Sequence, residues 1–249
     1  MCGINIIAIY HSPGEQVGSI GFGAMGLAAF YGEPGYNENH IGTFFKNHPG
    51  SREKVFLCTK FIMKYTESGE RVINGYREWF HQASNDSLKR LGVDKFDWYY
   101  ANRADSNVDV TATAAALKEL KEQGKFFTMR SSIGVLRTTP PSSLTPPSDA
   151  VSSLGENFNK NLELVSDIRK IADKKNAIPG QIALAWVLQE SPTIIPIPGA
   201  RKEKNLIDNN KAAHILLTKE EVAEIHGVIN SFKISGQRYD ADFIKTVAL

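Results

Sequence analysis

The stretch VFLCTK, residues 55–60, is a compact apolar run bounded by charged residues, which is typical of a buried parallel strand. A helical pattern follows over residues 77–91 and ends at Gly92, a residue type that commonly terminates helices. The sequence FDWYY, residues 96–100, predicts the next strand, and residues 111–123 predict the next helix. This alternation of strands and helices indicates βαβ units around a parallel sheet.

Further elements are predicted on both sides of these units. We expect strands over residues 17–25 and 194–198. We expect helices over residues 37–46, from 162 to about 176, over 179–190 and over 201–210. Thr218 followed by Glu221 is a capping box, and it predicts the start of one more helix.

Residues 131–155 interrupt the pattern. They are rich in Ser, Thr and Pro, contain two Pro-Pro pairs and show no periodicity, so they predict a loop or linker. A linker of this length is evidence against an intact barrel in a chain of this size. We therefore expect one domain over residues 1–249 that is interrupted at about 131–155.

Composition limits the function classes. The 249 residues hold 29 Lys and Arg against 27 Asp and Glu, and this balance argues against a nucleic-acid-binding protein. The apolar fraction of 42% suffices for a sizeable core, and a (β/α)8 barrel needs about 250 residues. Two cysteines cannot form a disulfide framework, and no run of about 18 apolar residues predicts a membrane span. We expect a cytoplasmic protein with neither nucleic acid nor membrane as partner.

Three residues are candidates for chemistry. Lys60 ends an apolar strand, where a barrel displays its catalytic groups; the alternative is a lysine turned to solvent. Tyr31 can act as a general acid toward a carbonyl oxygen, or it can simply pack under a loop. Asn102 follows the strand at 96–100 and can donate a hydrogen bond to a substrate oxygen, although an amide transfers no proton at neutral pH.

A phosphate site is predicted in IPIPGARKEKNLIDNN, residues 195–210. A strand that passes through Pro-Gly into a helix with Arg201, Lys202 and Lys204 brings backbone N–H groups and positive side chains together. The alternative is a solvated basic helix start. The chain has neither a P-loop nor a zinc-spaced set of Cys and His, so we expect no metal.

These segments resemble the aldo-keto reductases, in particular a fungal and bacterial branch. The resemblance is carried by GFGAMGLAAFYG (21–32), REKVFLCTKF (52–61), SLKRLGVDKFDWYYANRAD (87–105), GQIALAWVLQ (180–189) and IPIPGARKEKNLIDN (195–209). It implies a (β/α)8 TIM barrel that binds NADPH without a Rossmann fold and reduces an aldehyde or ketone, a small-molecule carbonyl substrate. Many relatives of this type are monomers or loose dimers.

The resemblance also implies site residues. Lys60 matches the lysine of the family tetrad, Tyr31 can match its tyrosine, and Asn102 stands where the family has a catalytic histidine. The cofactor motif falls on Gly199, Ala200, Arg201, Lys202, Asn205, Asp208 and Asn209.

The sequence departs from the family in several places. The segment with the first barrel helix and the strand that carries the catalytic aspartate is absent, and residues 126–132 match the next family strand poorly. The later family strands that reach the nicotinamide are replaced by the Ser/Pro-rich stretch. We therefore expect an incomplete barrel that lacks several β/α units. Two functions follow: NADPH-dependent carbonyl reduction with reduced or lost activity, or a catalytically silent remnant that binds nucleotide or a protein partner.

Overall fold

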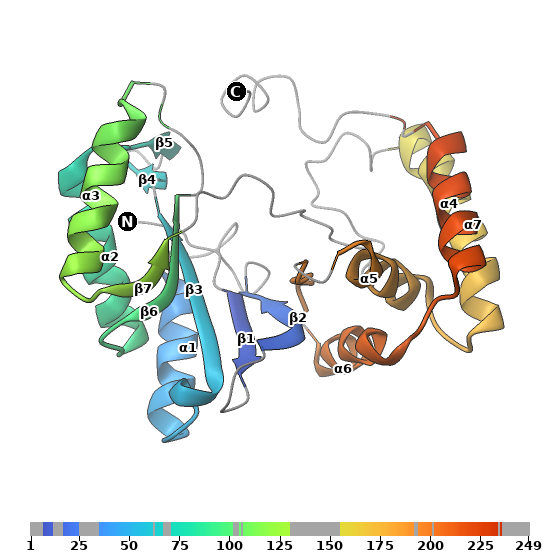
Figure 1. Ribbon diagram of the computed structural model, residues 1–249, viewed down its shortest axis with the longest axis horizontal. Helices are drawn as coiled ribbons and strands as arrows, with labels where there is room; N and C mark the ends of the chain where they lie inside the picture. The colour runs from blue at the N-terminus through green and yellow to red at the C-terminus, as the bar shows by residue number, and fades with distance from the viewer. Residues whose placement is uncertain are drawn as a thin grey trace. The chain divides into compact units, whose positions relative to one another are not determined.

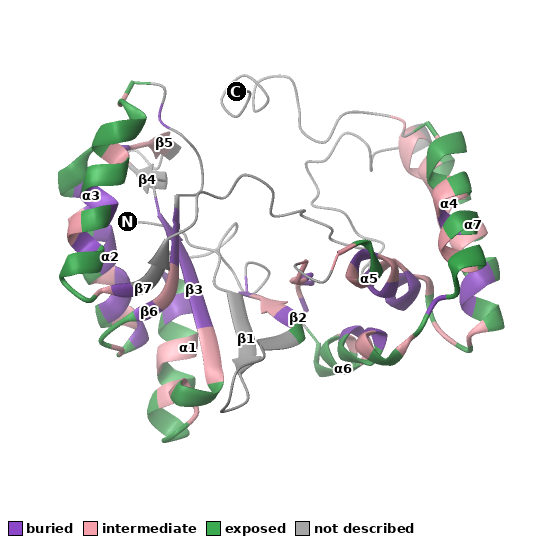
Figure 2. Ribbon diagram, in the orientation of Figure 1, coloured by how far each residue is buried: buried purple, intermediate pink, exposed green. Residues whose placement is uncertain are grey.

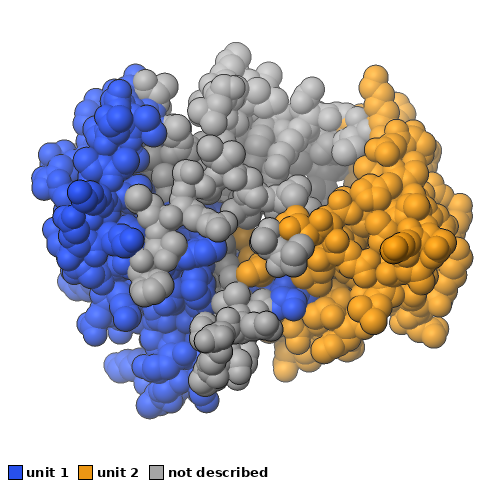
Figure 3. Space-filling model, viewed as in Figure 1, with its two compact units in different colours: residues 1–136, 199–201 blue, residues 137–198, 202–249 orange. Residues whose placement is uncertain are grey.

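The computed structural model divides into two compact units, which we describe separately. Unit 1 comprises residues 1–136 and 199–201, and unit 2 comprises residues 137–198 and 202–249 (Figure 3). The structure describes residues 7–11, 17–24, 35–61, 63–66, 71–101, 105, 107–129, 155–191, 194–200, 202–233 and 235. Apart from Gly155, the stretch predicted as a linker at 131–155 lies outside these residues.

Unit 1 is built on a five-stranded sheet with the strand order β2-β1-β3-β6-β7 (Figure 1). Its strands are β1 (Ile7–His11), β2 (Val17–Gly23), β3 (Val55–Phe61), β6 (Phe96–Ala101) and β7 (Phe126–Met129). β3, β6 and β7 run parallel, which confirms the βαβ organisation predicted for this region. β1 runs antiparallel to both of its neighbours, β2 and β3.

Three helices pack beside this sheet: α1 (Tyr36–Asn47), α2 (Arg77–Leu91) and α3 (Val110–Glu122). All three match predicted helices to within one residue at each end. Gly92 ends α2 in the left-handed conformation, with φ of 65°, which only glycine adopts without strain. Asp109 caps α3, because its side chain accepts a hydrogen bond of 2.7 Å from the backbone N–H of Thr111.

The core of unit 1 lies between the sheet and these helices. Side chains from β3, β6 and β7 meet those of α2 and α3, and the described buried residues form one band along the inner sides of the helices (Figure 2). Its largest fully buried members are Leu57, Phe61, Phe80, Leu91, Phe96, Tyr99 and Leu120.

Unit 2 is helical in its described part. It contains α4 (Gly155–Lys174), α5 (Pro179–Glu190), α6 (Glu203–Lys211), the short 3-10 helix η4 (Ala212–His214) and α7 (Lys219–Ser231). A second, smaller core joins α4, α5 and α7 and is formed by Ile171, Ala172, Ile182, Ala185, Leu217 and Ile225. The predicted capping box is confirmed, since Thr218 N–H donates to Glu221 Oε2 at 2.7 Å and Glu221 N–H donates to Thr218 Oγ1 at 3.2 Å.

One prediction about strands was wrong. Residues 194–198 form no strand, and the only pairing described nearby is one parallel bridge between Gly23 and Gly199. Phe126–Met129, which matched a family strand poorly, does form strand β7. Its place beside β6 and the burial of Phe126 outweigh the weak sequence pattern.

Three further strands were not predicted. β1 lies in an apolar run near the start of the sequence. The short hairpin of β4 (Met63–Tyr65) and β5 (Arg71–Ile73) follows β3 and forms a separate two-stranded sheet.

Candidate functional site

The alternation of side chains along β3 decides which residues face the helices. Leu57 and Phe61 belong to the core beneath the helices, and Thr59 donates a hydrogen bond of 3.0 Å to Glu38 of α1. Phe56, Cys58 and Lys60 therefore lie on the opposite face of the sheet, because successive residues of a strand point to opposite sides. In a closed barrel this second face is the interior.

Lys60 stands near the carboxyl end of β3 and is buried, with 9% of its surface exposed. In the parallel ladder its partner is Tyr100 of β6, which is 5% exposed. Because catalytic groups of barrel enzymes lie at the carboxyl ends of strands, this is where a reactive lysine is expected. The burial of Lys60 is incompatible with the alternative of a lysine turned to solvent.

Cys58 completes this group on the same face. Burial raises the pKa of its thiol to about 12, and the charge of Asp97 adds to the shift, so Cys58 stays protonated at neutral pH. A hydrogen bond with the Tyr100 side chain and the charge of Lys60 act on the thiol pKa in the opposite direction. Cys58, Lys60 and Tyr100 therefore form one polar cluster on this face of the sheet.

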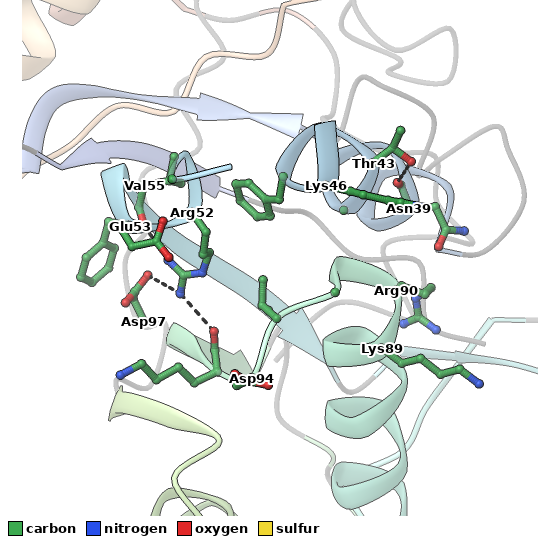
Figure 4. A pocket seen from close by; sticks show the side chains of 17 residues that line it. Asn39, Thr43, Lys46, Arg52, Glu53, Val55, Lys89, Arg90, Asp94 and Asp97 are labelled. Atoms are coloured by element: carbon green, nitrogen blue, oxygen red, sulfur yellow. Dashed lines mark hydrogen bonds and ion pairs between the residues drawn. The ribbon is translucent and has the colours of Figure 1, made fainter. Parts of the chain in front are cut away.

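The amino ends of β3 and β6 are joined by an ion pair. Arg52 Nη2 lies 3.0 Å from Asp97 Oδ2, and Asp97 also accepts a hydrogen bond of 2.6 Å from the backbone N–H of Leu57. Arg52 donates in addition to the carbonyls of Val55 and Lys95, at 2.8 and 3.0 Å (Figure 4). Asp97 thus has a structural role, because it joins the amino ends of β3 and β6.

A hollow of about 1160 Å³ opens at this amino end of the strands, between α1, the end of α2 and the ion pair (Figure 4). Val55 and Phe56 line it, whereas Lys60 lies at the other end of β3. Because barrel active sites lie at the carboxyl ends of strands, the hollow is on the wrong end for catalysis.

Glu38 is an additional buried group that the sequence analysis did not single out. It is fully buried, accepts the hydrogen bond from Thr59 and accepts another from Arg90 Nε of α2 at 2.5 Å. Burial raises the pKa of Glu38, and the Arg90 guanidinium opposes that shift. Glu38 thus connects α1 with α2 and β3. The sequence signal for this contact was the opposite charge of Glu38 and Arg90 in two predicted helices.

The other two candidates for chemistry, Tyr31 and Asn102, lie outside the described residues, as does Arg201 of the cofactor motif. Gly199 and Ala200 belong to unit 1. Gly199 bridges to Gly23 of β2, and a Cβ added at Gly199 would lie 3.5 Å from the Gly23 carbonyl oxygen.

The remaining cofactor candidates lie on or next to α6 in unit 2. Lys202 is exposed and stands at the N-cap of this helix, whose first turn also holds Glu203. Asp208 forms ion pairs with Lys211 and Lys204, whose Nζ atoms lie 3.0 and 3.3 Å from its carboxylate oxygens. These interactions lower the pKa of Asp208.

Asn209 differs from its neighbours on α6. It is 4% exposed, and its Nδ2 atom is buried without a hydrogen-bond partner in the described part of the chain. An unpaired buried donor costs free energy, and an acceptor atom of a bound nucleotide would satisfy it. Lys202 stands at the start of α6, whereas Asn209 lies in its last turn.

The family model "Aldo/keto reductase family" matches residues 17–135 and 127–230, which together include most of the chain. The chain belongs to the aldo/keto reductase family. Enzymes of this family carry out NADP-dependent reduction of small carbonyl compounds.

Two relatives illustrate the similarity of sequence. "Aldo-keto reductase yakc [NADP(+)]" from Schizosaccharomyces pombe is 30% identical, with 90% of this chain and 92% of the relative covered. "Aldo-keto reductase str7" from Strobilurus tenacellus is 28% identical, with 89% and 92% covered.

Solved structures show the fold of the aldo-keto reductases, a (β/α)8 barrel. The glycerol dehydrogenase of Gluconobacter oxydans matches with a TM-score of 0.66 at 17% identity, covering 83% of this chain and 80% of that one. A thermostable aldo-keto reductase solved with the inhibitor epalrestat matches with a TM-score of 0.58 at 19% identity, covering 78% of each. Among the described helices, none has the length and apolar character needed to cross a membrane.

Proposed function

We propose that this chain binds NADPH and reduces an aldehyde or ketone to the alcohol. The observation that carries the proposal is the burial of Lys60 near the carboxyl end of β3, on the face opposite the helices. A buried ammonium there stabilises negative charge that develops on a neighbouring oxygen, because the surrounding dielectric is low.

Each site residue has a proposed role. Tyr31 donates a proton to the carbonyl oxygen, Lys60 lowers the pKa of the Tyr31 phenol, and Asn102 orients the carbonyl by a hydrogen bond. When bound, the reduced nicotinamide supplies the hydride that the carbonyl carbon accepts. Gly199, Ala200, Arg201, Lys202, Asn205, Asp208 and Asn209 are the proposed cofactor residues, with the free Asn209 amide as support from the structure.

We also propose an incomplete barrel, within a single domain interrupted at about residues 131–155. The family match is divided into two segments. The alignment with the Schizosaccharomyces pombe relative runs over 314 positions, whereas 90% of a chain of 249 residues is only about 224 residues. Many positions of the relative thus have no counterpart here. Limited proteolysis is expected to cut within 131–155, and resistance there would contradict the linker.

A second candidate function is nucleotide binding without catalysis. The substitution of asparagine for histidine at position 102 favours it, because an amide cannot replace the acid–base function of an imidazole. A positioned proton donor contributes about 10²- to 10⁴-fold to a rate, so the loss of such groups reduces turnover by orders of magnitude. We further propose a monomer or loose dimer in the cytoplasm.

The test combines binding and turnover. NADPH fluorescence is titrated with the wild type and with Lys60→Met, and turnover of 4-nitrobenzaldehyde is then measured for both. NADPH binding by both proteins, with turnover only in the wild type, supports the reductase. Binding without turnover supports the silent remnant, and the absence of any fluorescence change rejects both functions.

A further inference from the structure

We propose that Tyr100 is a positioning residue that holds the ammonium group of Lys60 in place for the reaction. This inference rests on the proposed function, because it assigns Tyr100 to the site through Lys60. Tyr100 was not among the residues that the sequence pattern or the family resemblance pointed to.

The first argument is the register of the two strands. Lys60 and Tyr100 are directly paired in the parallel ladder, together with Cys58–Trp98, Thr59–Tyr99 and Phe61–Ala101. Adjacent strands lie about 4.8 Å apart, so paired side chains on one face are nearest neighbours. The edge-on contact between Phe56 and Trp98, with ring centroids 5.1 Å apart, shows that these two residues share a face. Lys60 and Tyr100 follow them on the same face, because side chains alternate along each strand.

The second argument is that the Tyr100 side chain is fixed. Its ring makes an edge-on contact with Trp98, with centroids 5.6 Å apart, and 5% of the residue is exposed. Its hydroxyl group shares a hydrogen bond with the Cys58 thiol. A phenol has one donor and two acceptor sites, so the oxygen retains acceptor capacity toward an ammonium group beside it.

The third argument concerns the surroundings of Lys60. Among the described residues of β3 and β6, the titratable groups that share its face are Cys58 and Tyr100. Glu38 lies on the helix side, where it accepts from Thr59, and Asp97 lies at the amino end of the strands with Arg52. On the other neighbouring strand, β1, Tyr10 pairs with Val55 at that same amino end, and His11 follows it.

A phenol oxygen that accepts a hydrogen bond from Lys60 favours the charged form of the lysine. Its removal is therefore expected to lower the pKa of Lys60, by about one unit for a hydrogen bond to a charged group. It also frees the side chain to adopt other rotamers, which reduces the fraction of molecules with the ammonium in the productive position.

The test measures Lys60 directly, without cofactor. Competitive acetylation followed by mass spectrometry gives the reactivity of each lysine against pH in the wild type and in Tyr100→Phe. We expect the titration of Lys60 to shift downward by about one unit in Tyr100→Phe, while exposed Lys118 and Lys204 react as before. An unchanged Lys60 titration in a folded Tyr100→Phe protein would overturn the proposal.

Two matched variants keep the test decisive. Cys58→Ser retains a hydrogen-bond partner for Tyr100 and is expected to leave the Lys60 titration unchanged. Cys58→Ala removes that partner and is expected to shift it downward, less than Tyr100→Phe does. If Tyr100→Phe does not fold, the pair of Cys58 variants carries the test, and equal Lys60 titrations in the two would reject the proposal.

Activity distinguishes this inference from the proposed function. In an active wild type, Tyr100→Phe is expected to shift the alkaline limb of the kcat/KM profile downward by the same amount as the Lys60 titration, with NADPH affinity unchanged. Complete loss of turnover at every pH, with normal NADPH binding, would mean that Tyr100 is more than a positioning residue. If the Lys60 titration shifts in Tyr100→Phe but the wild type does not bind NADPH, the proposed function is rejected and the contact between Tyr100 and Lys60 is retained.

Discussion

Glycine has different consequences at two helical positions of this chain. Gly42 lies within α1, and a Cβ added there would come closer to the carbonyl oxygen of Arg90 than real Cβ atoms do. Since that oxygen belongs to the backbone of α2, one of the two helices would have to move. We expect Gly42→Ala to lower the free energy of unfolding by about 1–3 kcal/mol, as overpacking does, measured by urea denaturation.

Gly227 in α7 provides the matched control, because nothing lies within 4 Å of a Cβ added there. Gly227→Ala is expected to raise the free energy of unfolding by about 0.5–1 kcal/mol, since alanine is the better helix former. If Gly42→Ala and Gly227→Ala changed the free energy of unfolding in the same direction, the close approach of α1 and α2 would have no energetic consequence.

The capping box of α7 predicts a pH dependence. The backbone N–H of Thr218, and then Lys175 with its Nζ at 2.9 Å, lower the pKa of Glu221 below the ordinary 4.5. A carboxyl whose pKa is lower in the folded state stabilises the fold above 4.5, and this contribution is lost as the pH falls through the folded pKa. Glu221→Gln retains the hydrogen bond of the cap without the charge, so the variant should lose less stability than the wild type as the pH falls below 4.5.

Thermal unfolding followed by helix circular dichroism at several pH values measures this effect. Glu224→Gln is the control, because Glu224 is paired with exposed Lys174 at 3.3 Å and is not part of the capping box. Wild type and Glu221→Gln losing equal stability on acidification would disprove the prediction.

At the scale of elements, local patterns predicted what depends on neighbouring residues. The helix at Arg77–Leu91 was predicted to the residue, because its apolar spacing and its terminating glycine are both local. The position of Lys60 near the end of β3 follows from the local apolar run in the same way, whereas its catalytic role stays a prediction. Strand β7, the place of β1 and the partnership of Lys60 with Tyr100 depend on pairing between distant segments, which no local pattern contains.

The place of β1 is the clearest case. In a (β/α)8 barrel all strands run parallel, whereas here an antiparallel strand lies between β2 and β3. Ala8 pairs with Phe22 on one side and with Leu57 on the other, so β1 is a central strand that hydrogen-bonds to both neighbours. Without β1, two strand edges of the described sheet would have no partner.

Proline at position 8 tests this arrangement. Proline donates no hydrogen bond and is found almost only at edges or bulges of sheets, so Ala8→Pro should destabilise unit 1 by about 2–3 kcal/mol or more. Ala8→Ser keeps the N–H and serves as the control. The β3 amides should exchange their hydrogens faster in Ala8→Pro than in the wild type. Unchanged protection of the β3 amides in Ala8→Pro would contradict the pairing of β1 with β3.

At the scale of the whole molecule, the described residues form two hydrophobic cores that share no member. One joins the sheet to α2 and α3, and the other joins α4, α5 and α7. Leu57 and Ile182 are each fully buried, one in each core. Replacement of a buried Leu or Ile by alanine costs about 2–5 kcal/mol, because it removes apolar contacts and leaves a cavity.

Paired substitutions show whether the two cores unfold as one. If each core is a separate cooperative unit, Leu57→Ala will accelerate hydrogen exchange in β3, β6 and α2 alone, and Ile182→Ala in α5 and α7 alone. Val110→Ala is the control. Because Val110 is 77% exposed, this substitution should leave the hydrogen exchange of both units unchanged. Accelerated exchange in both units after either core substitution would show that they unfold together, as one interrupted domain does. This comparison therefore tests the proposed single domain. A loop within one domain leaves the unfolding of the two units coupled, whereas a linker between independent units does not.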